Sequence, residues 1–166
     1  MKNILKDYPQ PKTPRYLKKN FRSFKDTLIA SYRDKEFYNG SRSTGYGGYK
    51  YDGRWASVAR NCNNLYKLKN NSKILDLGCK KGFIMKDFKM LLPNSKVFGV
   101  EDHKYPIINA ENEIKKNIIC SKYFRVPFKK NYFDFTIGFS SIYKYNLYEV
   151  VKTIKEINRV SKKSFI

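Results

Sequence analysis

The sequence is poor in the groups that build metal centres and disulfide frameworks. Among its 166 residues it has one histidine, His103, and three cysteines, Cys62, Cys79 and Cys120. The cysteines are odd in number, lie far apart and form no Cys-x-x-Cys pair, so the sequence indicates neither a disulfide framework nor a structural zinc site. No metal is therefore expected, and a reducing, cytoplasmic location is the default interpretation.

Long apolar segments are also missing. No stretch of about 18 apolar residues occurs, so no membrane span is predicted, and residues 1–12 lack the apolar core of a signal peptide. Hydrophobic residues nevertheless make up 41% of the chain and aromatic residues 16%. These proportions exclude a disordered or collagen-like chain, and the length suits one domain with a hydrophobic core.

Acidic residues are scarce, because 14 Asp and Glu stand against 35 Lys and Arg, which gives a formal net charge of +21. Such a charge is typical of proteins that bind nucleic acid or a membrane surface. However, 27 of the 35 basic residues are Lys, and Arg is the residue that grips phosphate with a fork of donors. Asn, Ile, Tyr and Phe, which share AT-rich codons with Lys, are also abundant. We therefore interpret the charge mainly as solvated surface lysines, and a nucleic-acid partner is not favoured.

Residues 1–72 are predicted to form an arm and a helical cap. Thr13 and Pro14 suit the N-cap and the first position of a helix. Apolar residues then follow at helical spacing: Leu17, Phe21, Phe24, Leu28 and Ile29. We expect this helix to lie on the rest of the domain, with a basic membrane-binding helix as the alternative. Residues 40–55 hold five of the nine glycines and predict a Gly/Tyr-rich loop, and helical spacing resumes from Trp55 to Tyr66.

From residue 73 to residue 166, strand-like and helix-like segments alternate. Apolar runs predict strands at residues 73–77, 96–100, 118–120, 133–139 and 164–166. Helical spacing predicts helices at residues 83–92, 105–116 and 147–157. This alternation is typical of an α/β domain, so we predict a Rossmann-like, mostly parallel sheet with flanking helices over residues 73–166.

The segment with chemical information is the turn that follows the first of these strands, between Gly78 and Gly82. Glycines let a ligand approach the backbone closely, and the start of the next helix offers free N–H groups to an anion. Glu101 ends the next strand, 19 residues after Gly82, where a carboxylate can accept hydrogen bonds from both hydroxyls of a ribose. The implied ligand is a nucleoside that carries an anionic or zwitterionic group.

Five segments together carry a resemblance to a known family. They are Ile74–Phe83, Val97–Glu101, Val126–Phe128, Tyr132–Phe135 and Lys155–Val160. In their order and spacing the chain resembles class I S-adenosylmethionine-dependent methyltransferases of the type 11-like kind. Upstream, Tyr46–Trp55 is similar to a subgroup associated with surface-polysaccharide or sugar biosynthesis. The resemblance implies S-adenosylmethionine as the cofactor.

The resemblance also assigns residues to the methionine and ribose ends of that cofactor. Asp76 and Gly78 would lie beside the methionine part, and the backbone around Cys79 and Gly82 would approach it. Glu101 would bind the ribose.

Other residues would complete the pocket. The Tyr123 backbone N–H would donate to the adenine ring, and Phe139 and Ser140 would face the transferred methyl group and the substrate. Arg54 would pair with the cofactor carboxylate, because a guanidinium grips a carboxylate with two hydrogen bonds. The resemblance assigns no catalytic residue.

Plainer roles stand beside these assignments. Asp76 could cap the turn after its strand, Glu101 could be a solvated strand end, and Arg54 could be a surface residue at a helix start. Cys79 is interpreted as a packed thiol rather than a nucleophile, since no histidine is near it in the sequence. His103 is interpreted as a surface or helix-start residue rather than a general base.

Three positions depart from the family pattern. Lys80 stands where the family has a glycine, and if that position needs a positive φ the lysine costs roughly 1 kcal/mol. Asp102 replaces an apolar residue that packs on adenine, and Lys122 replaces an acceptor for the adenine amino group although an ammonium has no acceptor to offer. The chain also ends at its fifth strand, so we expect a C-terminally truncated domain with an unpaired sheet edge.

The expected function is methyl transfer from S-adenosylmethionine to an unidentified small-molecule or sugar-related acceptor. One alternative is a non-catalytic, degenerate methyltransferase-fold binding module. Another is a nucleic-acid-binding protein or RNA methyltransferase, although the aromatic-proline motif of amino-group methylases is absent from Phe139–Ile142. The sequence leaves the oligomeric state open. The space between Gly78 and Glu101 is the place where a nucleoside pocket is expected.

Overall fold

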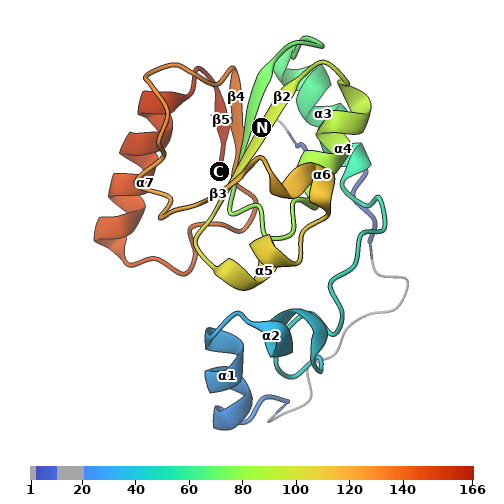
Figure 1. Ribbon diagram of the computed structural model, residues 1–166, viewed down its shortest axis with the longest axis vertical. Helices are drawn as coiled ribbons and strands as arrows, with labels where there is room; N and C mark the ends of the chain where they lie inside the picture. Colours follow the sequence, from blue (N-terminus) through green and yellow to red (C-terminus); the bar gives the residue numbers. More distant parts are fainter. Residues whose placement is uncertain (1–2, 11–20) are drawn as a thin grey trace.

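The computed structural model describes residues 3–10 and 21–166. Within these residues the strands form one five-stranded, all-parallel sheet with the order β3-β2-β1-β4-β5 (Figure 1). The strands are β1 (Lys73–Leu77), β2 (Lys96–Glu101), β3 (Ile118–Cys120), β4 (Phe135–Ile137) and β5 (Ser164–Phe165). The predicted α/β class and the Rossmann-like sheet are confirmed. β4 is shorter than the expected 133–139, with Phe133 joined to Ser161 only by an isolated bridge.

Helices cover both faces of this sheet, which is why β1 is apolar on both sides. Successive side chains of a strand point to opposite faces. Ile74 belongs to a buried cluster with α3 (Ala56–Tyr66) and α4 (Phe83–Leu91), whereas Leu75 and Leu77 belong to a second cluster with α7 (Leu147–Val160). Figure 1 shows α7 on one side of the sheet and α3 and α4 on the other. Asp76 therefore lies on the α3 and α4 side.

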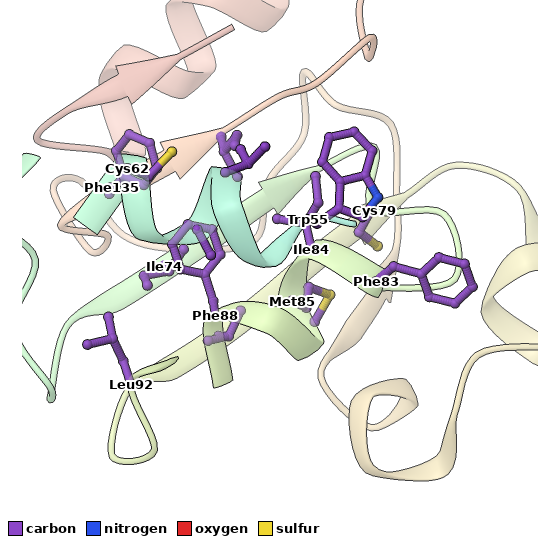
Figure 2. Packing of buried hydrophobic residues seen from close by; sticks show 14 of the residues in the cluster. Trp55, Cys62, Ile74, Cys79, Phe83, Ile84, Met85, Phe88, Leu92 and Phe135 are labelled. Carbon is purple, nitrogen blue, oxygen red and sulfur yellow. The ribbon is translucent and has the colours of Figure 1, made fainter. Parts of the chain in front are cut away.

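The packing of α3 and α4 fixes the edge of the sheet at which the strands end. Cys62, Ile74, Met85 and Phe88 are fully buried and pack together between the helices and the sheet (Figure 2). The N-cap of α4 is Gly82, in the left-handed conformation. Because one face of α4 is closely packed against buried apolar residues, the first turn of α4 and the loop before it have a fixed position.

The region between β2 and β3 corrects one prediction. The single helix expected over residues 105–116 is wrong, because the structure has two short helices, α5 (Lys104–Ile108) and α6 (Asn112–Lys115). The Tyr105 carbonyl accepts from both the backbone N–H of Asn109, at 3.1 Å, and its side-chain amide, at 2.8 Å. Glu111 is extended at the start of α6. The helix that apolar spacing alone would continue therefore ends at Asn109, after which the Ala110 N–H donates to the Ile107 carbonyl, three residues back, at 3.2 Å.

The N-terminal elements are α1 (Phe24–Ser31) and α2 (Lys35–Asn39), which lie beyond α5 and apart from the sheet (Figure 1). α1 begins with a capping box between Ser23 and Asp26 and has no buried residue. The start expected at Thr13 and Pro14 lies outside the described residues. α2 is tied to the domain by Tyr38, whose ring stacks 5.7 Å from that of Tyr105. No helix in residues 3–10 and 21–166 is long and apolar enough to cross a membrane.

Candidate functional site

The candidate site lies at the edge where the parallel strands end. The turn after β1 reaches across to β2, because the N–H groups of Gly78 and Cys79 both donate to the Val100 carbonyl, at 2.8 and 3.2 Å. Gly78 has φ 76° and Gly82 has φ 77°, which are conformations that favour glycine. Lys80, between them, has φ 54°, so the lysine does stand at a position of positive φ.

Asp76 is the most unusual carboxylate of this edge. Its side chain is 2% exposed, and its Oδ2 atom has no hydrogen-bond partner among the described residues. Burial, and then the nearby charge of Glu101, raise the pKa of Asp76 to about 7, although Lys80 opposes the shift. A buried polar atom without a partner costs folding free energy. Such a group at a strand end is a candidate for binding a ligand.

Glu101 is buried rather than solvated, with 3% of the residue exposed. Its Oε2 atom accepts a hydrogen bond from the Lys80 N–H at 3.0 Å. Its Oε1 atom accepts from the N–H groups of Asp102 at 3.0 Å and His103 at 3.2 Å. The carboxylate is therefore held in one orientation by backbone donors from two segments.

Tyr123 places its side chain, and not only its backbone, at the site. The phenol hydroxyl lies 3.4 and 3.5 Å from the two carboxylate oxygens of Glu101. A Cβ atom on Gly78 would lie 3.0 Å from the same hydroxyl. Burial and the charge of Glu101 raise the pKa of Tyr123 far above the ordinary value, so the hydroxyl keeps its proton. The Tyr123 N–H, expected to face adenine, points to the Tyr145 hydroxyl at 3.3 Å.

Asp102 anchors a second group of polar side chains beside Glu101. Lys144 forms an ion pair with Asp102, and the His103 Nδ1 atom lies 2.7 Å from the same carboxylate. The Tyr145 hydroxyl donates to Asp102 at 3.0 Å. Lys122 is a more distant partner at 3.8 Å. A cavity of about 390 Å³ opens beside this group and is lined by it together with Ser31, Arg33 and Glu149.

A larger cavity, of about 650 Å³, lies on the other side of the turn. Two of the expected site residues, Arg54 and Phe139, line it, together with Lys80 and Ser140. The rest of its wall is largely aromatic and basic and consists of Tyr8, Arg42, Tyr46, Gly47, Gly48, Tyr49, Lys50, Asp52, Trp55 and Phe83. We refer to it below as the aromatic cavity.

The walls of the aromatic cavity are held by local contacts. Arg54 is half exposed and pairs with Asp52, with an Nε–Oδ2 distance of 2.8 Å. The Trp55 and Phe139 rings meet edge to face with centroids 4.8 Å apart, and Tyr49 stacks on Phe83 at 4.6 Å. Figure 2 shows the Phe83 ring directed away from the buried cluster. Residues that precede β1 and residues that follow it thus share one cavity.

The structure brings four of the eight expected residues together, since Asp76, Gly78, Glu101 and Tyr123 surround the turn after β1. Gly82 has a packing role, because a Cβ atom there would lie 2.4 Å from the Ile114 side chain.

Cys79, also expected at the turn, is buried, and burial raises the pKa of its thiol well above the ordinary value. Lys144 and Tyr145 were not expected at the site. Both residues lie in the loop between β4 and α7, and they approach Glu101 and Asp102 only in the folded chain.

An all-parallel sheet, a glycine turn after its first strand and a buried acid at the end of the second together define a Rossmann-like class of α/β domain. More narrowly, residues 75–164 match the family described as "Methyltransferase domain". This match covers more than half of the chain, so the chain belongs to that family. A comparison with curated proteins found no match.

Several solved structures share this fold. A protein described as an S-adenosylmethionine-dependent methyltransferase from Methanococcus maripaludis aligns with a TM-score of 0.58 and 15% identity, over 90% of this chain and 64% of its own length. A methyltransferase from Aquifex aeolicus gives 0.51 and 18%, over 84% and 69%. The [4+2]-cyclase SpnF gives 0.53 and 20%, over 68% and 45%. Identities this low show the fold alone, and this chain spans less than two thirds of the first protein's length.

Proposed function

We propose that the chain is an S-adenosylmethionine-dependent methyltransferase domain that acts on a small, sugar-related acceptor. The observation that carries the proposal is Asp76, a buried carboxylate with an unpartnered Oδ2 beside the positive-φ turn at Gly78. In this proposal residues 73–166 hold most of the cofactor, Arg54 reaches its carboxylate, and other residues of the segment 1–72 supply part of the acceptor side. Membership of the methyltransferase family supports the reaction class.

The residues at the methionine end fit the cofactor. The free Oδ2 of Asp76 would accept a hydrogen bond from the cofactor ammonium. Gly78 would let the cofactor approach the backbone once the Ser141 and Tyr123 side chains, which pack against it, shift. Lys80 and Arg54 line the adjacent aromatic cavity and offer cations to the cofactor carboxylate. At the ribose end Glu101 supplies the expected carboxylate, and a nucleoside fits there once the Tyr123 side chain moves.

The bound cofactor supplies an electrophilic methyl group on its sulfonium. The task of this chain is then to hold donor and acceptor in line and to exclude water. No histidine or cysteine is found among the described residues that line the aromatic cavity, and positioning of this kind needs no strong base. Asp76, whose pKa is raised to about 7 by burial first, would lose its proton when a cation binds beside it.

The aromatic cavity suggests the chemistry of the acceptor. Its wall carries the rings of Trp55, Tyr49 and Phe139. Besides Arg54 and Lys80, which are assigned to the cofactor carboxylate, it carries the cations Arg42 and Lys50 against the single carboxylate of Asp52. Pockets of this kind bind a ring against apolar faces and fix it with a few polar contacts. A sugar that carries an anionic group matches both features, which agrees with the sugar-related subgroup that Tyr46–Trp55 resembles.

A second candidate function is a ligand-binding module without catalysis. One observation favours it, because the Tyr123 hydroxyl already lies against both oxygens of Glu101. Binding of S-adenosylmethionine would distinguish both candidate functions from a protein that has lost the site. Methyl transfer to an acceptor would then distinguish the methyltransferase from the non-catalytic binding module.

Isothermal titration with S-adenosylmethionine and S-adenosylhomocysteine tests the proposal. We expect the full chain to bind both, and we expect Asp76→Asn to weaken binding at least tenfold, which is about 1.4 kcal/mol. Asp87→Asn is the matched control, since Asp87 is also buried with an unpartnered Oδ2 but lies within α4. Wild-type binding at pH 7 should also release protons, seen as a buffer-dependent enthalpy that Asp76→Asn lacks. Absence of binding by every variant would overturn the proposal.

A further inference from the structure

The ribose place at the end of β2 is filled by a side chain of the protein itself. A nucleoside bound at this edge must place its ribose hydroxyls on Glu101 and its bulk against Gly78. The Tyr123 hydroxyl meets both demands, since it lies 3.4 and 3.5 Å from the Glu101 oxygens and 3.0 Å from a Cβ atom placed on Gly78. Tyr123 is only 2% exposed. The phenol and a ribose cannot occupy this space together.

Side chains from the loop between β4 and α7 hold Tyr123 there. The Lys144 ammonium donates to the Tyr123 hydroxyl at 3.3 Å and lies 4.6 Å from the centre of its ring. The same ammonium pairs with Asp102. The Tyr145 hydroxyl accepts from the Tyr123 N–H at 3.3 Å and donates to Asp102 at 3.0 Å. Both contacts of the loop therefore connect Tyr123 to the residue after Glu101.

Lys144 compensates the negative charges of Glu101 and Asp102 only while the loop between β4 and α7 stays in place. Asp102 and Glu101 are both buried, with 3% of each side chain exposed. Burial opposes ionisation of Asp102, but hydrogen bonds from His103 and Lys144 lower its pKa overall. Removing Lys144 would leave two adjacent buried carboxylates facing His103 and the more distant Lys122. Displacement of Tyr123 is therefore coupled to the Lys144–Asp102 ion pair.

The two cavities support the same arrangement. Tyr123 lines neither of them. Its hydroxyl contacts Lys144, which lines the smaller cavity, and lies over the turn whose Lys80 lines the aromatic cavity. The Tyr123 hydroxyl therefore lies between a residue of each cavity, and its displacement would free the space between Gly78 and Glu101.

We infer that Tyr123 controls the binding of the nucleoside half of the ligand. Its hydroxyl occupies the ribose position on Glu101, and Lys144 holds it there. The inference rests on the proposed function for the identity of the ligand. It adds that the methionine half and the nucleoside half of the ligand have different requirements for binding. Arg54 and Lys80, which would receive the methionine carboxylate, already line the aromatic cavity, whereas the ribose end is available only after Tyr123 moves.

Fragments of the cofactor provide the test. We expect Tyr123→Leu to bind adenosine at least tenfold more tightly than the wild-type chain, and to bind free methionine with unchanged affinity. Tyr123→Phe keeps the ring in the core and removes only the hydroxyl, so a smaller gain, about threefold, is expected from loss of the bonds to Glu101 and Lys144. Phe133→Leu is the matched control, because Phe133 is fully buried in the same cluster without touching Glu101.

Kinetics give a second readout that does not depend on the folding of Tyr123→Leu. Stopped-flow binding of S-adenosylmethionine to the wild-type chain should show an observed rate that saturates with ligand concentration, because Tyr123 must first leave. Tyr123→Phe should raise the limiting rate. Equal adenosine affinity in wild type, Tyr123→Phe and Tyr123→Leu would overturn this inference while leaving the proposed function standing. Loss of all binding, of S-adenosylmethionine and both fragments, would overturn both.

Discussion

The backbone N–H of Lys80 donates a hydrogen bond of 3.0 Å to Oε2 of Glu101. This bond joins the turn after β1 to the end of β2, and it is made by a residue whose φ is 54°. The left-handed conformation of Lys80 thus aims its N–H at the carboxylate. The departure from the family glycine at this position keeps the backbone geometry and adds a side-chain cation to the aromatic cavity.

Replacing Lys80 with glycine should therefore stabilise the fold. Relief of the left-handed conformation is worth roughly 1–2 kcal/mol, and the greater freedom of the unfolded chain takes back part of it, so a gain of about 0.5–1 kcal/mol is expected in urea unfolding. Lys67→Gly is the matched control, because Lys67 also has φ 54°, at the end of α3. Only Lys80→Gly should raise the pKa of Asp76, followed by carboxyl NMR, because Lys80 opposes that shift.

Equal Asp76 titration in Lys80→Gly and Lys67→Gly would show that the Lys80 ammonium does not act on the site.

Asp76 should give the fold a characteristic dependence on pH. Burial first, and then Glu101, raise the pKa of Asp76 to about 7 from an ordinary value of 3.8. Between these values the folded chain binds more protons than the unfolded chain, so the free energy of unfolding falls as pH rises. The whole effect is on the order of 4 kcal/mol. Urea unfolding between pH 4 and pH 8 should show a slope that Asp76→Asn reduces, and parallel slopes would contradict the assignment.

The sheet could be predicted from the sequence because its signals are local. β1 is a short apolar run followed by Gly78, and α7 has apolar spacing after a capping box of Asn146 and Glu149. The break after α5 was missed because the apolar spacing continues on both sides of it, and the extended backbone of Glu111 that interrupts the helix leaves no periodic signal. α2 is only five residues long and too short for spacing to reveal.

The candidate site was predictable only along its backbone. The positions of Asp76, Gly78 and Glu101 follow from where strands end in a parallel sheet, so their approach could be inferred from spacing. The direction of the Tyr123 side chain could not, because it depends on Lys144 and Tyr145 from a loop about 20 residues later in the chain. Tertiary contacts of that kind leave no periodic signal in the sequence.

The cysteines should differ sharply in reactivity. Cys62 and Cys79 are buried, whereas Cys120 is exposed. Burial raises the pKa of Cys62 to about 12 and that of Cys79 well above its ordinary value, and only thiolates react readily with disulfide reagents. The native chain should therefore release one equivalent of chromophore rapidly with an aromatic disulfide reagent, and Cys120→Ser should release almost none. Fast reaction of the Cys120→Ser chain would show that the turn at Cys79 opens.

The packing of α6 against the turn gives the most direct test of the site's frame. Gly82 has φ 77°, and a Cβ atom there would lie 2.4 Å from the Ile114 side chain. Gly48 has φ 103°, but a Cβ atom there would meet nothing within 4 Å. Gly48→Ala therefore carries the backbone cost alone, about 1–2 kcal/mol, and Gly82→Ala adds overpacking of about 1–3 kcal/mol.

The difference between the two alanine variants in urea unfolding measures the steric contact of Gly82 with Ile114. The double variant Gly82→Ala with Ile114→Leu removes the Cγ2 methyl group that makes this contact and should recover part of the loss, whereas Ile114→Leu alone should cost less than about 1.5 kcal/mol. Costs that simply add in the double variant would mean that Gly82 is required for its φ and not for the close approach of α6.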